Sequence, residues 1–229
     1  MSILFIAYIW EDSLSTESEK ITIEQLSAEL ANTQRHVEQL TLELQEAKEN
    51  LHQLVYRDGL SGLYNRRYMQ QMIRKELERS LRYASPFSLV IFDLDDFAGL
   101  RENFGAANSD LVIMNVARIV EQQARPCDIV ARYSDHQFAV LLPETDISGV
   151  KIFADRLRES IRETATLVDG KEIKTTISAG GTTFNPEAPQ VTMSDFIKTA
   201  EQALSEASDD GNNQIRVILL SMTQDQVSE

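Results

Sequence analysis

The sequence predicts an α+β protein, in which a split βαβ sheet is flanked by helices and preceded by a long coiled-coil helix. Two observations support this prediction. A heptad repeat occupies the N-terminal quarter of the 229 residues, and short apolar runs then alternate with helical periodicities. We therefore divide the chain into a short apolar start and polar linker (1–20), a coiled-coil helix (21–57), a folded domain (58–220) and a polar tail (221–229).

Charge supports a boundary near residue 57. The formal net charge is -14, and residues 1–56 carry ten acidic and three basic side chains, while residues 57–229 carry 26 and 19. Each part therefore has a net charge of -7, although the second part is three times longer. Such acidity argues against binding to nucleic-acid polymers or to an anionic membrane surface. The single cysteine, Cys127, excludes an internal disulfide framework and a cysteine-cluster zinc site.

The N-terminal start is apolar at residues 3–10 and polar at residues 11–20. The apolar run is too short to span a bilayer, and it lacks the basic flank and cleavage site of a signal peptide. We interpret it as a short strand, a hydrophobic contact or a truncated start, and residues 11–20 as a linker. The expected location is the cytoplasm.

A coiled coil is predicted over the next residues. Eight of ten seam positions are aliphatic residues larger than alanine, and no glycine or proline interrupts them. The narrow apolar seam and the polar outer face favour a parallel dimer over a helix that lies on the globular domain. The two sets of seam positions are Ile23, Leu30, Val37, Leu44 and Leu51, and Leu26, Thr33, Leu40, Ala47 and Leu54.

After Asp58-Gly59, which ends the helix, strand and helix patterns alternate. The run 87–92 is continuously apolar apart from one serine, as in a strand buried on both faces. Two short runs around residues 134–137 indicate a hairpin. The expected elements are helix 65–83, strand 87–92, helix 111–120, strands 129–133 and 138–142, helix 147–163, strand 174–181, helix 192–207 and strand 215–219.

Three motifs in this order resemble the GGDEF domain of diguanylate cyclases, from about Asp58 to Val217. Residues 58–67, DGLSGLYNRR, are similar to the family's D-x-L-T-G-L-x-N-R-R motif, and residues 92–97, FDLDDF, resemble its first metal-carrying strand end. Residues 132–138, RYSDHQF, occupy the place of R-Y-G-G-D/E-E-F. The resemblance implies a GGDEF, nucleotide-cyclase-like fold and a catalyst that joins two GTP molecules into cyclic di-GMP across a symmetric dimer.

The third motif departs from the family pattern at four positions. Ser134 and Asp135 replace the two glycines that let backbone approach the nucleotide. His136 replaces the acidic residue to which the family assigns catalysis, and Gln137 replaces a second metal-binding glutamate. Because Mg²⁺ prefers anionic oxygen, Gln137 opposite Asp93 leaves at best half a metal site.

Other parts of the GTP site that the resemblance implies are also altered. Arg101 stands where the family has a guanine-contacting asparagine, although its acidic partner persists as Asp110. Ser208 and Asn212 replace a lysine and an arginine of a late motif. We therefore interpret Asp93, Asp110 and residues 134–137 as a vestigial active site, with no catalytic residue, and expect that the protein is not an enzyme.

Three acidic residues, Asp93, Asp95 and Asp96, follow the predicted strand at 87–92. Asp93 could bind Mg²⁺, but only weakly. Asp95 and Asp96 could contribute to a metal site or cap the following helix. We expect no required cofactor and no functional metal site.

A ligand site is predicted instead at Arg125, Asp128 and Arg156. The resemblance places an R-x-x-D product-inhibition motif five residues before the hairpin motif, where Arg125-Pro126-Cys127-Asp128 occurs, and Arg156 aligns with its helix arginine. Cyclic di-GMP presents phosphates and guanine edges, which the planar fork of arginine binds in pairs of hydrogen bonds. The alternative is a surface ion pair between Arg125 and Asp128.

The hypothesis from the sequence is a catalytically inactive GGDEF-like domain that acts as a cyclic di-GMP receptor and signals through a coiled-coil homodimer (21–57) to an unknown protein partner. The alternatives are a nucleotide-free dimerisation or interaction scaffold and a GTP-binding switch without turnover. No membrane span is expected.

Overall fold

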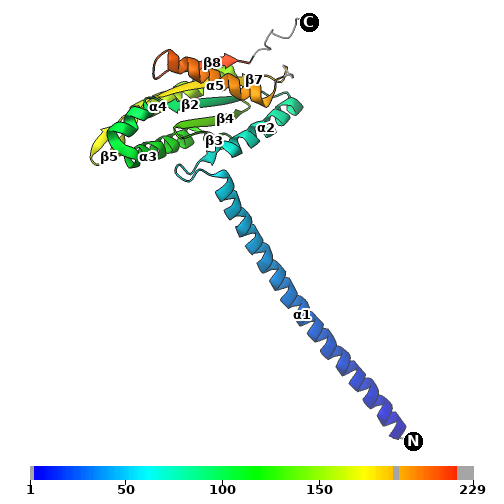
Figure 1. The fold of residues 1–229 in the computed structure, drawn as a ribbon. Helices are drawn as coiled ribbons and strands as arrows, with labels where there is room; N and C mark the ends of the chain where they lie inside the picture. The colour runs from blue at the N-terminus through cyan, green and yellow to red at the C-terminus, as the bar shows by residue number, and fades with distance from the viewer. Residues whose placement is uncertain (1–2, 188–190, 221–229) are drawn as a thin grey trace. The chain divides into compact units, whose positions relative to one another are not determined.

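The computed structural model describes residues 3–187 and 191–220. The chain divides into two compact units, with the boundary in the sequence between Val55 and Tyr56 (Figure 1). The expected tail at 221–229 lies outside the described residues. Within these residues, no helix is long and apolar enough to cross a membrane.

The first unit is a single helix, α1 (Ile3–Tyr56). The linker predicted at residues 11–20 and the strand considered for residues 3–10 are therefore wrong. Polar residues alone do not end a helix, and the first glycine of the chain is Gly59. The coiled-coil pairing of α1 stays a prediction. Six of its seam residues are 50–70% exposed: Leu26, Leu30, Val37, Leu40, Leu44 and Leu51.

The second unit is built around a six-stranded mixed sheet in the order β1-β3-β4-β2-β7-β8. The central strand β2 (Phe87–Leu94) runs antiparallel to β4 (Gln137–Pro143) and β7 (Ile177–Phe184). Strand β3 (Ile129–Arg132) forms a hairpin with β4, and β1 (Tyr64–Asn65) and β8 (Ile215–Leu219) are parallel edge strands. The order β2-α3-β3-β4-α4-β7 confirms the predicted split βαβ arrangement.

Helices cover both faces of this sheet, in agreement with the predicted sheet flanked by helices. Helices α2 (Arg66–Tyr83) and α5 (Met193–Asp209) pack on one face, against Leu89 and Ile91 of β2. Helices α3 (Phe97–Gln123) and α4 (Ile147–Glu163) pack on the other face, against Val90 and Phe92. Because side chains alternate along a strand, the continuous apolar run of β2 supplies both cores.

Several elements differ from the sequence-based expectation. The strand predicted at 174–181 is β7, which begins at Ile177 and ends at Phe184. Helix α3 begins at Phe97 rather than near residue 111, and it is interrupted at Gly105, whose φ of 81° is not helical. The hairpin of β5 (Thr166–Val168) and β6 (Lys171–Ile173) was not predicted. Its turn is Asp169-Gly170, with φ of 49° and 77°, a pair that favours a two-residue hairpin turn.

One glycine in β7 determines how closely α5 approaches the sheet. A Cβ atom added to Gly180 would overlap the backbone of α5 at Leu204, Ala200 and Ala203. By contrast, a Cβ atom on Gly59 would have no atom within 4 Å. Only the residue without a side chain permits the observed packing at position 180.

We expect Gly180→Ala to lower the free energy of unfolding by about 2–3 kcal/mol, because α5 must move away from β7. Urea unfolding of the full chain measures this change. The control Gly59→Ala is expected to alter stability by less than about 0.5 kcal/mol. Equal unfolding midpoints for the two variants would contradict the packing argument.

Candidate functional site

The β3-β4 hairpin has the predicted position and a tight turn. The backbone N–H groups of Tyr133 and Ser134 both donate to the carbonyl oxygen of Gln137, at 2.7 and 3.1 Å. Ser134 and Asp135 are exposed at the tip, where the family pattern has glycines. The hairpin therefore forms without these glycines and presents two side chains to solvent.

Three residues that the sequence analysis grouped do come together beside this turn. Asp93 lies directly opposite Gln137 in the β2-β4 register, and the Gln137 Nε2 donates to the Asp93 Oδ2 at 3.0 Å. The His136 Nε2 lies 3.5 Å from the same oxygen. Burial raises the pKa of Asp93, although Gln137 and His136 oppose this effect. Its Oδ1 atom is buried without a hydrogen-bond partner.

The His136 side chain is 41% exposed and stacks on Phe97, with ring centroids 5.5 Å apart. This exposure follows from its place in the hairpin turn. The contact of His136 with the Asp93 carboxylate was not predicted from the sequence.

The two following aspartates have structural partners. Asp96 caps α3, since its side chain accepts from the Gly99 N–H at 3.2 Å, which confirms the capping interpretation. Asp95 does not cap the helix. Its carboxylate accepts from the hydroxyls of Thr176 and Ser178, at 2.6 and 2.7 Å, and from the backbone N–H of Asn213, at 2.8 Å. Asp95 thus ties β2 to β7 and to the loop before β8.

This set of donors does not fit the two-carboxylate magnesium site that the family implies. Asp95 already accepts from three donors, and Asp93 faces an amide and an imidazole instead of a second carboxylate. In the described part of the chain, no group of three or more histidine, cysteine or acidic side chains is arranged to hold a metal ion.

The other positions of the expected nucleotide site are spread over the surface. Arg101 and Asp110 are exposed on α3, on either side of the break at Gly105. Ser208 is exposed near the end of α5. Asn212 borders a hollow of about 400 Å³ that Asp95 and Asp96 also line. The structure thus brings Asn212 near the strand end, while Arg101, Asp110 and Ser208 do not line that hollow.

A half-buried ion pair connects the first motif to the hairpin. Arg132 Nη1 lies 3.2 Å from the Asp58 Oδ1, and Arg132 Nη2 donates to the carbonyl oxygen of Asp135 at 2.6 Å. Asp58 also accepts from the backbone N–H and the hydroxyl of Ser61. Burial raises the pKa of Asp58, but the hydrogen bonds from Ser61 and Arg132 outweigh it, and the net pKa is lowered.

The three residues of the predicted ligand site gather at the C-terminal end of α3. Asp128 Oδ2 accepts from the backbone N–H of Arg125 at 2.7 Å, and the Asp128 N–H donates to the Arg125 carbonyl at 2.9 Å. Arg156 reaches from α4 to donate to the Gln123 carbonyl at 3.0 Å. Asp128 therefore holds the backbone of the turn, which differs from the side-chain ion pair considered as the alternative.

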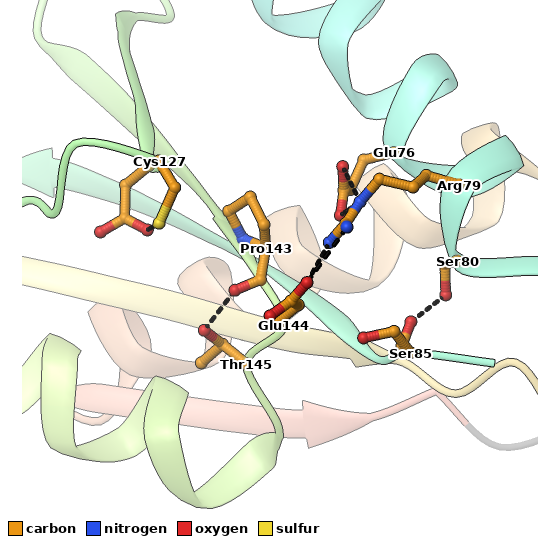
Figure 2. Close-up of polar contacts among 9 residues, drawn as sticks. Glu76, Arg79, Ser80, Ser85, Cys127, Pro143, Glu144 and Thr145 are labelled. Atoms are coloured by element: carbon orange, nitrogen blue, oxygen red, sulfur yellow. Dashed lines mark hydrogen bonds and ion pairs between the residues drawn. The ribbon is translucent and has the colours of Figure 1, made fainter. Parts of the chain in front are cut away.

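Arg125 lies between two hollows. One, of about 340 Å³, is shared with Arg57, Tyr64 and Asp128, and the other, of about 400 Å³, with Arg79 and Glu144. In the second hollow the guanidinium of Arg79 lies between Glu76 and Glu144, at 2.9 and 3.0 Å (Figure 2). The first hollow includes Arg57 and Tyr64, which the sequence analysis did not select because neither belongs to a ligand motif.

Residues 55–214 match the family described as "Diguanylate cyclase, GGDEF domain". The chain belongs to the GGDEF family, and the fold and motif resemblance are confirmed. Among curated relatives, diguanylate cyclase A of Treponema denticola is 32% identical over 128 residues, 56% of this chain and 34% of that protein. Probable diguanylate cyclase DgcC of Escherichia coli K12 is 28% identical over 179 residues, 78% of this chain and 47% of that protein.

Solved structures also resemble this chain. Diguanylate cyclase SiaD of Pseudomonas aeruginosa, solved in complex with its activator SiaC, has a TM-score of 0.71 and 27% identity, covering 94% of this chain and 80% of that one. The coiled coil and GGDEF domain of DgcB from Caulobacter crescentus, solved with c-di-GMP, has a TM-score of 0.72 and 23% identity, covering 84% and 99%. The latter likeness shows the fold alone.

These relatives correct one prediction. The expectation that the chain is not an enzyme is wrong, because the curated relatives are named as diguanylate cyclases and the family evidence points to a cyclase. The substitutions at residues 134–137 led to that expectation, but they do not remove the chain from a family of enzymes. The chain spans about a third to a half of the length of these relatives.

Asp58 and Asp93 are expected to affect stability with opposite pH dependence. The lowered pKa of Asp58 means that its contribution is present above the usual value of 3.8 and is lost as the pH falls through the folded-state pKa. Asp58→Asn should therefore cost about 1–2 kcal/mol at pH 7, and less in acid.

The raised pKa of Asp93 means that its charge opposes folding at neutral pH. Asp93→Asn should raise the melting temperature at pH 7 by a few degrees, and this gain should disappear below the usual pKa of 3.8. Thermal melts of both variants from pH 3 to pH 8 measure these effects. Parallel curves for the two variants would contradict the assignment.

Proposed function

We propose that this GGDEF domain works in cyclic di-GMP signalling and binds cyclic di-GMP at Arg125, Asp128 and Arg156. The observation that supports this most is the convergence of the three residues on one end of α3, from helix α4 and from the turn that follows α3. Arginine binds phosphate and the guanine O6/N7 edge with paired hydrogen bonds, and aspartate accepts from guanine donors. We expect this binding to require no metal ion, and Mg²⁺ to bind only weakly at Asp93.

Calorimetric titration of the full chain tests this proposal. We expect cyclic di-GMP to bind the parent chain. Arg125→Ala should lower the affinity for cyclic di-GMP at least about tenfold, since a charge-assisted contact to the ligand is lost. Arg118→Ala, a change on α3 outside the proposed site, is the control. No binding at high micromolar ligand would exclude the receptor role and favour a scaffold, and binding unaffected by Arg125→Ala would exclude this site.

We also propose that α1 pairs with a second copy as a parallel coiled coil. The exposed seam supports this, because six large aliphatic side chains on one unit have no core of their own to enter. Outside the seam, Glu43 and Lys48 occupy the flanking positions that face each other between chains in a parallel dimer. Such pairing would join two GGDEF domains and give a route from ligand to a protein partner.

The dimer is tested by two glutamate substitutions of similarly exposed leucines. Leu44 lies in the seam and is 70% exposed, whereas Leu42 lies outside it and is 60% exposed. We expect Leu44→Glu to shift the chain to monomer in light scattering after size exclusion, and Leu42→Glu to leave it dimeric. Loss of the dimer in both variants, or in neither, would contradict the seam.

Diguanylate cyclase activity is the second candidate function, and membership of the GGDEF family favours it. Asp93 is the carboxylate that this chain retains at the strand end, and Gln137 stands opposite it. Restoring a carboxylate at residue 137 should therefore improve any reaction of GTP at this site.

We expect Gln137→Glu to raise the conversion of GTP to cyclic di-GMP at least about tenfold, and Asp93→Asn to lower it. Chromatography of the nucleotides measures the product. Gln71→Glu on α2 is the matched control for added charge, and should leave the rate unchanged. Absence of product from both the parent chain and Gln137→Glu would contradict the cyclase and leave the binding proposal intact.

A further inference from the structure

The hollow of about 340 Å³ beside Arg125 combines an apolar lining with charged groups of both signs. Its apolar part comes from Leu63, Ala124, Pro126 and Val130, and its charged part is given by Arg57, Glu121, Arg125 and Asp128. A volume near the lower end of ligand pockets suits one flat ring system rather than a whole dinucleotide. The hollow therefore suits part of a ligand whose remainder lies outside.

One wall of this hollow is a stack of flat groups. The guanidinium carbon of Arg57 lies 3.9 Å from the centroid of the Tyr64 ring, and Tyr64 stacks on Tyr68 with centroids 3.9 Å apart. Arg57 is held by its hydrogen bond to the Gly62 carbonyl at 3.0 Å and by a backbone bridge to Tyr64. Because its position is fixed in the free protein, Arg57 loses little freedom when a ligand binds.

The guanidinium groups of Arg57 and of Arg79 in the neighbouring hollow differ in their ion pairs. Arg79 is already paired with Glu76 and Glu144 (Figure 2). Among the residues that the structure describes, no carboxylate lies within ion-pair distance of Arg57 or Arg125. An anionic or electron-rich ligand can therefore engage both arginines without breaking an existing ion pair.

Two carboxylates, from Glu121 and Asp128, line the same hollow. Asp128 uses Oδ2 for the backbone N–H of Arg125, while Glu121 is exposed on α3. Guanine carries donors at N1 and N2 on one edge, and adenine has an acceptor at N1 and no N2 donor. A carboxylate in this place favours guanine over adenine.

We infer that this hollow is a base subsite that receives one guanine of the ligand, stacked on the face of the Arg57 guanidinium that Tyr64 does not cover and recognised by Glu121. The inference rests on the proposed binding of cyclic di-GMP at Arg125, and extends that site towards Arg57. Arg57 directly follows the last residue of α1 in the sequence, so the subsite includes the first residue after that helix.

Titration of the full chain with cyclic di-GMP and cyclic di-AMP tests the subsite. Glu121→Gln keeps the shape but replaces the carboxylate, and should weaken cyclic di-GMP about tenfold while affecting cyclic di-AMP little. Arg57→Lys keeps the charge but loses the planar stack, and should weaken cyclic di-GMP about three- to tenfold. Glu172→Gln, on the remote β6 strand, is the matched control, and thermal melts verify that each variant is folded.

The outcomes separate this inference from the proposed function. Loss of binding in Arg125→Ala, with unchanged affinity in both Glu121→Gln and Arg57→Lys, would overturn the subsite and retain the proposed site. Equal affinity of the parent chain for the two dinucleotides would overturn the role of Glu121. No binding of cyclic di-GMP to the parent chain would overturn the proposed function, and the subsite with it.

Discussion

The pairing of β2 with strands on both sides is the constraint on which the rest of the domain depends. All eight residues of β2 pair with β7, and seven pair with β4, so its register fixes both neighbours at once. A shift by one residue would exchange the side chains that β2 contributes to the two cores, and the packing of both would be lost. The same register sets Asp93 opposite Gln137 and Ser178, and thereby determines the chemistry at the strand end.

Two polar side chains, Asp95 and Arg132, connect loops outside the sheet to its strands and turns. Asp95 accepts hydrogen bonds from β7 and from the loop before β8, and Arg132 joins the first motif to the hairpin turn. Asp95 accepts from three donors, whereas Asp93 Oδ1 and Arg132 Nε are buried without a hydrogen-bond partner. Burial acts to raise the pKa of both Asp93 and Asp58, but the hydrogen bonds from Ser61 and Arg132 lower the net pKa of Asp58, so the two pKa shifts have opposite sign.

The domain thus presents two regions with different chemistry. The strand end near the hairpin carries Asp93, His136 and Gln137, a set of donors that departs from the carboxylates of its enzyme family. The region at the end of α3 carries Arg57, Arg125 and Arg156, and none of these arginines has a carboxylate partner among the described residues; two of them line a hollow with flat and acidic walls. We propose this second region as the binding site of an anionic nucleotide, and its hollow includes the residue that follows α1.

Much of the fold could be predicted from local patterns. Helix α4 and strand β8 have the predicted bounds, because amphipathic spacing and a β-branched run are clear in a single segment. The start of α3 was not predicted, since Gly105 interrupts its pattern, and the β5-β6 hairpin was missed although Asp169-Gly170 is a recognised turn signal. The polar residues 11–20 were taken for a linker, but they lack a residue that ends a helix.

The sequence by itself determined the family, the central strand and the hairpin, because motif order and apolar runs are properties of the chain, and it predicted a ligand site at Arg125, Asp128 and Arg156. Only the tertiary structure decided what those residues contact. Asp95 became a structural anchor because β7 and the loop before β8 fold against it, and Arg57 borders the same hollow as Arg125 because two segments far apart in the sequence pack together. Such contacts depend on packing between elements that are far apart in the sequence, which a local sequence pattern does not reveal.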